Sequence, residues 1–213
     1  MALTLNCDED FDLPTRLGKH LTYIELDITF TFTDTPTIDY DLLDCLQHYT
    51  HLTKLTLTSV PVYITPHKLY SIPELAELSI RDVTADFPPE CLAAFPRYCP
   101  KLSQLEFDSC EFQSEVCSAQ LVDTLNQATS LQMLFLSSSL LHPDFWANIR
   151  SQYRGTSIAR LRLNSMDLMP AEVDSLLTSS LISQLRALEL CNLRLLESNN
   201  SFLGNISALF QLH

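Results

Sequence analysis

The sequence predicts an α/β fold in which a short strand, a turn and a helix recur along the chain and build a curved solenoid. Two observations support this prediction. A six-residue phrase with apolar residues at its first, fourth and sixth positions occurs seven times, and successive copies begin 23 to 31 residues apart. A stretch with the apolar spacing of a helix follows most of the copies. Hydrophobic residues make up 46% of the 213 residues, which is enough to fill a continuous core.

Each copy of the phrase is expected to form a strand. Its second and third apolar residues are two positions apart, so both face one side of a strand while the residue between them faces the other side. A period of about 20 to 30 residues with this pattern is typical of a leucine-rich repeat solenoid (horseshoe), with parallel strands on the concave face and helices on the convex face. The seven copies are Leu21-Ile24-Leu26, Leu52-Leu55-Leu57, Leu75-Leu78-Ile80, Leu102-Leu105-Phe107, Leu131-Leu134-Leu136, Ile158-Leu161-Leu163 and Leu185-Leu188-Leu190.

The segments between the phrases are expected to form the helices. Ser114 is a candidate helix cap, and Cys117, Leu121 and Leu125 recur every four residues after it. Pro170 occupies a position that a first helical turn tolerates, ahead of an apolar stripe. That stripe consists of Val173, Leu176 and Leu177; further helices are expected over Asp39–Gln47, Pro89–Tyr98 and Pro143–Gln152, and a turn or irregular helix over Tyr63–Tyr70.

A chain of repeats needs no second globular unit, so we expect one domain over residues 1–213. Residues 1–20 would form an N-terminal cap, in which Ala2–Cys7 is a degenerate strand, and residues 21–193 would form the repeats. Residues 194–213 would form a C-terminal cap or a truncated repeat. Within them, Phe202–Leu212 is expected to be helical. This stretch is more apolar than a terminal cap usually is, which suggests that it stacks against another element.

The charge of the chain argues against several classes of partner. The formal net charge is −13, with 26 acidic residues against 13 basic ones. A chain this acidic repels the phosphates of nucleic acids and the surface of an anionic membrane. No apolar run reaches the roughly 18 to 20 residues that span a bilayer, and the first ten residues lack the basic region of a secretory signal. We therefore expect a cytoplasmic protein that binds neither nucleic acid nor membrane.

The seven cysteines do not resemble a disulfide framework, because their number is odd and their spacing irregular. Cys45, Cys91 and Cys117 fall within predicted helices, and Cys110 fills an inward-facing repeat position. Reduced, buried cysteines in a cytosol-like compartment are the interpretation that fits this distribution.

The repeats resemble the ribonuclease-inhibitor-like and cysteine-containing leucine-rich repeats. The resemblance is greatest in LSQLEFDSCEFQSEVCSAQLVDTLNQATSLQMLFL (102–136), where Cys110 stands at the position that this family fills with Asn or Cys, whose side chains satisfy backbone groups along the turn. The family resemblance implies a binding surface, either as the substrate-recruiting arm of an F-box ubiquitin ligase or as a bacterial effector delivered into a host cell. We expect no F-box itself, because the first phrase begins at Leu21. The other copies depart from the family pattern at this position, with Thr29, Val60, Val83, Ser139, Met166 and Leu193.

If the strands stack in register, their outward-facing residues form three columns along the concave face. Most residues of these columns are polar. The first column is Tyr23, Lys54, Glu77, Gln104, Met133, Arg160 and Ala187; the second is Glu25, Thr56, Ser79, Glu106, Phe135, Arg162 and Glu189; the third is Asp27, Thr58, Arg81, Asp108, Ser137, Asn164 and Cys191.

One part of these columns stands out as a candidate partner-binding site. Met133 and Phe135 are apolar at positions that should face solvent, and an apolar anchor flanked by charges is typical of an interface hot spot. Alternatively, the strand registers differ, or another element covers Phe135. The arginines could equally form an ordinary surface network with Glu189 or with the acidic side. The flanking charged residues are Glu106 and Asp108 on one side and Arg160 and Arg162 on the other.

No motif for catalysis, cofactor binding or metal binding is present. Three glycines in the whole chain make phosphate-binding loops implausible, and neither CxxC nor HExxH spacing occurs. Cys191 is the one cysteine in the concave columns, but no histidine occupies a neighbouring column position that could activate it. We therefore predict a non-enzymatic module that binds a protein partner, as an adaptor or substrate-recruiting scaffold, and takes no cofactor, metal or small-molecule substrate. The alternatives are an effector that acts in a host cytoplasm and a structural subunit of a larger assembly.

Overall fold

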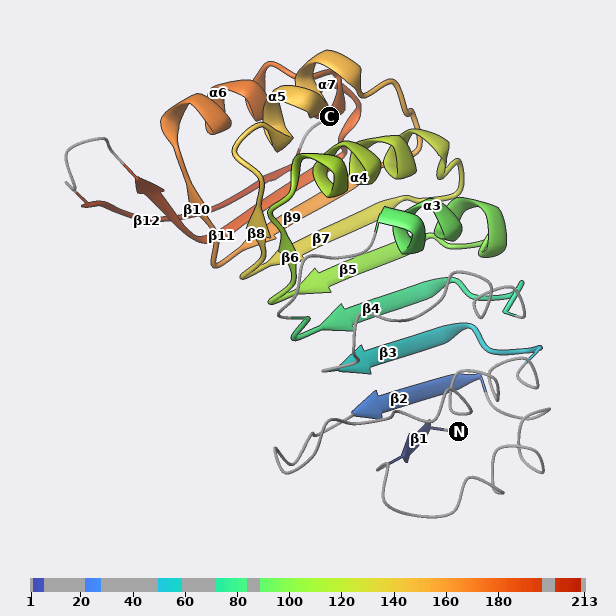
Figure 1. The fold of residues 1–213 in the computed structure, drawn as a ribbon. Helices are drawn as coiled ribbons and strands as arrows, with labels where there is room; N and C mark the ends of the chain where they lie inside the picture. The colour runs from blue at the N-terminus through green and yellow to red at the C-terminus, as the bar shows by residue number, and fades with distance from the viewer. Residues whose placement is uncertain are drawn as a thin grey trace.

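The computed structural model describes residues 2–5, 22–27, 50–58, 72–83, 89–196 and 202–211, and of residues 2–5, 24–27 and 202–211 it describes the backbone alone. The helix expected over Asp39–Gln47, the turn over Tyr63–Tyr70 and Cys45 lie outside these residues. Within them, the fold is α/β with a mostly parallel sheet (Figure 1).

From residue 77 to residue 196 strands and helices alternate along the chain, as the repeated phrase predicts. The helices are α3 (Pro89–Tyr98), α4 (Glu115–Gln127), α5 (Phe145–Gln152), α6 (Pro170–Leu177) and α7 (Ser180–Gln184). The longer strands are β1 (Ala2–Leu5), β2 (Tyr23–Asp27), β3 (Lys54–Thr58), β4 (Glu77–Arg81), β5 (Gln104–Asp108), β7 (Met133–Ser137), β9 (Arg160–Asn164), β11 (Ala187–Leu196) and β12 (Phe202–Gln211). Three two-residue strands follow the turns: β6 (Glu111–Phe112), β8 (Leu140–Leu141) and β10 (Asp167–Leu168).

The main sheet runs in chain order, β1-β2-β3-β4-β5-β7-β9-β11, and every neighbouring pair in that run is parallel. Equivalent positions of successive phrases lie opposite one another in the register. Leu78 pairs with Leu105, Leu105 with Leu134, and Leu134 with Leu161. The columns expected from the sequence are therefore present wherever the strands are described.

The core lies between the sheet and the helices. In β5, β7 and β9 the second and fourth residues are buried while the first, third and fifth are partly or fully exposed, so one face of the sheet is covered and the other is open. We call this second face the open face. The helices pack against one another in chain order, α3 on α4, α4 on α5 and α5 on α6, and Figure 1 shows them gathered on one side of the strands. The predicted separation of an inward and an outward set of residues is confirmed for β5, β7 and β9, whereas the middle residues of β3 and β4, Thr56 and Ser79, are buried.

Local capping fixes where α4 and α6 begin. The Ser114 hydroxyl accepts a hydrogen bond from the Cys117 backbone N–H at 3.1 Å, which confirms the predicted cap of α4. Pro170 opens α6, where the Met169 N–H donates to the Glu172 carboxylate at 2.7 Å. The stripe predicted for α6 is only partly right, because Leu176 is buried whereas Leu177 is 52% exposed. The α6 helix is two turns long, and its last residue faces solvent.

A residue in the left-handed conformation follows each of β4, β5, β7 and β9, and Asn192 takes the same conformation within β11. The backbone N–H groups of Asp82, Ser109 and Ser138 each donate to the last carbonyl of the next long strand; for Ser138 this carbonyl belongs to Asn164, at 2.9 Å. This repeated bond links neighbouring turns into a ladder. Serine, aspartate and asparagine are among the residue types that tolerate φ > 0. The residues concerned are Asp82 (φ 55°), Ser109 (54°), Ser138 (47°), Ser165 (52°) and Asn192 (52°).

The residue that follows this left-handed position points inward. The Cys110 thiol donates to the Ile80 carbonyl at 3.4 Å, so it satisfies a backbone group as expected. Ser139 does the same in the next copy, with its hydroxyl 3.0 Å from the Ser137 carbonyl. Met166 and Leu193 are buried at this position without such a group, so packing replaces hydrogen bonding in those copies.

The C-terminal segment differs from the prediction. Phe202–Leu212 was expected to be helical, but residues 202–211 form β12, which pairs antiparallel with β11. A short apolar run fits a strand and a helix equally well, so its pattern does not discriminate between them. Pairing with β11 also satisfies backbone groups along an edge that would otherwise be open.

No helix in the described residues is both long enough and apolar enough to cross a membrane.

Candidate functional site

The register of the sheet brings the predicted site residues together on the open face. Phe135 lies on β7 between Glu106 of β5 and Arg162 of β9. Met133 lies two residues earlier on the same strand, opposite Arg160. The two apolar side chains are half-buried rather than fully exposed. The remaining predicted residue, Asp108, lies on β5 at the third column position, diagonal to Phe135.

The acidic side of this patch already has a cation. Glu106 Oε1 lies 3.5 Å from Arg81 Nη2, and Arg81 Nε donates to the Ser79 hydroxyl at 3.0 Å. Asp108 Oδ1 accepts a hydrogen bond from the Ser109 hydroxyl at 3.4 Å. Arg81 was placed in the columns from the sequence, but its pairing with Glu106 was missed, because the reach of a side chain decides it.

On the basic side, two arginines share one carboxylate. Arg160 Nε lies 3.6 Å from Glu189 Oε1, and Arg162 Nε lies 3.8 Å from Glu189 Oε2. The arginine side chains are 49% and 48% exposed, whereas that of Glu189 is 22% exposed. One of the alternatives drawn from the sequence, a network with Glu189, is therefore present. It leaves one positive charge in excess beside the apolar pair.

Farther along the open face the surface is closed by long side chains. Lys54 Nζ and Glu77 Oε2 are 3.0 Å apart, and the same ammonium group lies 5.5 Å from the centre of the Tyr23 ring. Beneath them Thr56 and Ser79 are buried although they belong to the outward column, and a hollow of about 110 Å³ remains. This region differs from β7 in residue type. Lys54 and Glu77 form an ion pair across the face, whereas Met133 and Phe135 carry no charged group that could pair with a neighbour.

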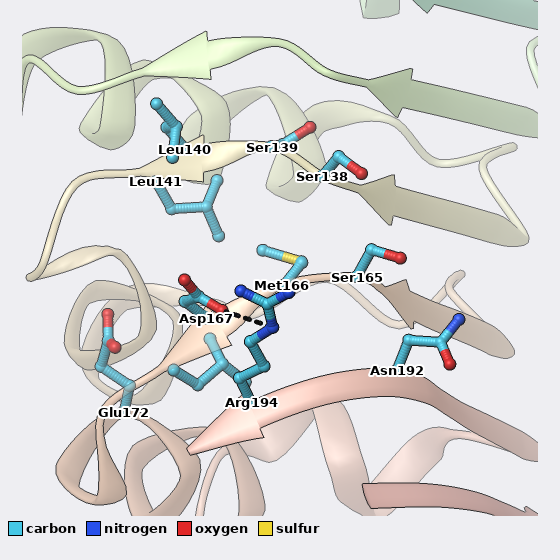
Figure 2. A pocket seen from close by; sticks show the side chains of 11 residues that line it. Ser138, Ser139, Leu140, Leu141, Ser165, Met166, Asp167, Glu172, Asn192 and Arg194 are labelled. Atoms are coloured by element: carbon cyan, nitrogen blue, oxygen red, sulfur yellow. Dashed lines mark ion pairs between the residues drawn. The ribbon is translucent and has the colours of Figure 1, made fainter. Parts of the chain in front are cut away.

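A larger hollow of about 560 Å³ lies beyond the turns, between β8 and β10 (Figure 2). Its walls include Leu141 of β8, Asp167 of β10 and Arg194 of β11. The sequence analysis did not find it. The sequence feature that could have indicated this hollow is a difference in length between two strand-to-helix connections. α5 starts eight residues after the end of β7, whereas α6 starts six residues after the end of β9.

The chemistry available among the described residues is limited. Groups of three or more His, Cys, Asp or Glu side chains that could hold a metal ion are absent from them. Cys91, Cys99 and Cys110 are buried thiols that form no disulfide, and burial raises the pKa of each thiol to about 12, which keeps them protonated at neutral pH. Cys191 is a free, half-buried thiol in the third column.

Comparisons with models of known protein families and with curated protein sequences find no match for this chain.

Proposed function

We propose that this chain is a leucine-rich repeat solenoid and acts as a non-enzymatic protein-binding module. The observation that carries the proposal is the position of Phe135, an aromatic side chain on the open face between Glu106 and Arg162. An apolar centre with a charged rim is the usual anatomy of a protein interface. The phrase repeated at intervals of 23 to 31 residues supports the repeat class, and the parallel pairing in chain order is compatible with it.

In this mechanism the partner buries Met133 and Phe135 and meets opposite charges on either side. The pair Arg160 and Arg162 shares one carboxylate, so an acidic group of the partner would complete its charge balance. On the other side Arg81 already pairs with Glu106, which leaves Asp108 to contact a donor or cation. Such charges fix orientation and association rate more than affinity.

The experiment is affinity capture from a eukaryotic cell lysate followed by mass spectrometry. It compares the wild type with the Phe135→Glu/Arg162→Glu double variant. Val116→Glu, at an exposed position of α4, is the control because it also replaces an apolar side chain by a carboxylate but lies away from the open face. We expect a protein that the wild type and Val116→Glu retain and the double variant loses. Equal retention by all three folded proteins would contradict binding at the open face.

Family resemblance supports two biological settings for such a module. One is a cytoplasmic adaptor that recruits substrates to a ubiquitin ligase, and the other is an effector that binds proteins in a host cytoplasm. None of the five cysteines of the described residues forms a disulfide, which supports a reducing compartment. The partners named by the capture experiment would distinguish these settings.

A structural subunit of a larger assembly is the second candidate. The observation that favours it is β12, a ten-residue strand at the end of the sheet that pairs with β11 alone in the described part of the chain. A long edge strand is a site where another chain can add. A protein that sediments as a single monomer across a wide concentration range would argue against this candidate.

A further inference from the structure

The short strands beyond the turns form a second ladder beside the main sheet. β6 pairs with β8, and the Leu140 N–H donates to the Cys110 carbonyl at 2.9 Å. β10 pairs with β11, and the Arg194 N–H donates to the Met166 carbonyl at 2.9 Å. These bonds join equivalent positions of successive copies, so the ladder follows the same repeat as the main sheet.

The ladder is broken between β8 and β10. By the same equivalence the Asp167 N–H would donate to the Ser139 carbonyl, yet no hydrogen bond joins β8 to β10, although both strands lie wholly within the described residues. The turns just before them remain linked through Ser138 and Asn164 at 2.9 Å. β8 and β10 therefore diverge from their linked turns like the arms of a fork, and the hollow of about 560 Å³ lies between them. The backbone N–H and C=O groups of Leu141 and Asp167 face this hollow.

Two local features hold the fork open. The Met169 N–H, which would continue the pairing toward β8, instead donates to the Glu172 carboxylate at the start of α6. The connection from β7 to α5 is also two residues longer than that from β9 to α6, so the two connecting segments follow different paths after their turns. The break follows from the sequence of these two copies and not from an irregularity in the main sheet.

The space is large enough for a ligand and has a defined lining. Its volume of about 560 Å³ falls in the range of small-ligand and peptide pockets. Met166 and Leu168 contribute an apolar floor, and both are buried beneath the surface. Figure 2 shows Leu141 on the β8 side of the space and Asp167 and Arg194 on the opposite side.

The rim of the space carries more negative than positive charge. Asp167 Oδ1 lies 3.9 Å from Arg194 Nε, so these two exposed charges offset each other. Glu172 adds a second, half-buried carboxylate whose Oε2 accepts the Met169 N–H. Burial raises the pKa of Glu172 above its ordinary value, which means that a cation placed beside it would favour its ionised form.

We propose that an extended segment of a partner protein fills this break, pairs with the backbone of β8 or β10, and places a Lys or Arg beside Asp167 and Glu172. An apolar side chain of the same segment would lie against Leu141 and Met166. Addition of a strand is an established mode of peptide recognition, in which main-chain bonds give affinity and alternate side chains give specificity. The site lies beyond the turns and shares no residue with the Phe135 patch, so neither proposal depends on the other.

The probe for this site is a positional-scanning library of acetylated, amidated hexapeptides. Binding is followed by the backbone amide shifts of Leu141 and Asp167 in the full-length ¹⁵N-labelled chain. We expect the selected pools to carry Lys or Arg at one position and apolar residues at alternate positions, and to shift both amides. A copy of the best peptide with N-methylated backbone amides keeps its side chains but should lose binding, because it cannot donate to a strand.

Two variants separate this site from the open face. Asp167→Asn is expected to weaken binding of the best peptide about 1.4- to 5-fold, which is the range for an exposed ion pair. Asp123→Asn on α4 serves as the matched control and should leave binding unchanged. Phe135→Glu should bind the peptide like the wild type. The proposal is overturned if no pool shifts these amides at millimolar concentration, if the N-methylated peptide binds equally well, or if acetyl-lysine amide alone matches the peptide. Loss of binding in Phe135→Glu would also overturn it, because the peptide would then occupy the open face.

Discussion

Alkaline pH should destabilise this fold through three buried thiols. Cys91, Cys99 and Cys110 are 3%, 2% and 0% exposed, and burial raises the pKa of each from 9.0 to about 12. The unfolded chain releases these protons near pH 9, whereas the folded chain holds them until near pH 12. The contribution of each thiol to stability is therefore complete below pH 9 and is lost as the pH rises toward 12.

The size of the effect follows from the three shifts. One pKa unit corresponds to about 1.4 kcal/mol, so three thiols together give a slope of about 4 kcal/mol per pH unit above pH 9. A domain of ordinary stability has about 5 to 15 kcal/mol to lose. The free energy of unfolding should thus fall by about 3 kcal/mol between pH 9 and pH 10, because the unfolded thiols are only half ionised at pH 9, and a chain at the lower end of the range would unfold near pH 10 to 11.

Urea denaturation between pH 7 and pH 10.5 measures this slope, with the emission of the single tryptophan as the signal. Trp146 is 1% exposed on α5, so its emission should be blue-shifted in the folded protein and move to longer wavelength on unfolding. Cys99→Ala removes one thiol and should reduce the slope of stability with pH by about a third. Its loss of core packing lowers stability by the same amount at every pH and does not change the slope. Cys191→Ala, at a half-buried position, is the matched control. A free energy of unfolding that is constant from pH 8 to pH 10.5, or equal slopes in the wild type and Cys99→Ala, would refute the reasoning.

The remaining predictions concern single side chains and are measured by urea or thermal denaturation. Leu134→Ala should cost about 2 to 5 kcal/mol because the side chain is buried in the core, whereas Met133→Ala on the open face should cost less than about 1 kcal/mol; equal costs would contradict the assigned faces of β7. Ser114→Ala should cost about 1 kcal/mol through loss of the cap of α4, and Ser114→Asp should restore it; an unchanged Ser114→Ala protein would contradict the cap. Ser138→Val should cost about 1 to 3 kcal/mol because a β-branched residue is strained at φ 47°, whereas Ser138→Gly should be tolerated; the reverse order would contradict the turn.

The sequence predicts the main sheet well because the repeated phrase carries two kinds of information. Its spacing identifies equivalent positions, and its alternation identifies the face of each residue. Leu105, Leu134 and Leu161 therefore line up in register as expected. The cap at Ser114 was also predictable, because a capping serine acts within its own helix turn.

The features that the sequence did not reveal depend on contacts between copies. The apolar pattern alone does not show that residues 202–211 would pair with β11 rather than form a helix, because edge pairing is a tertiary effect. Nor does it show that Arg160 and Arg162 converge on Glu189, because that depends on side-chain reach. The break between β8 and β10 needs a comparison of two connection lengths, which a search for similarity between copies overlooks.

The relative size of two effects decides how the open face would hold a partner. Full burial of a Phe or Met side chain contributes about 1.5 to 3 kcal/mol, whereas an exposed ion pair contributes about 0.2 to 1 kcal/mol. Phe135 should therefore carry more of the affinity than Arg162, whose charge is half satisfied by Glu189 before a partner arrives. It follows that Phe135→Ala should raise the dissociation rate at any salt concentration, because apolar burial is not screened. Arg162→Ala should mainly lower the association rate, and only at low salt, because exposed charges are screened beyond about 10 Å at 0.1 M. Equal salt sensitivity of the two variants would mean that charge and not apolar burial holds the partner.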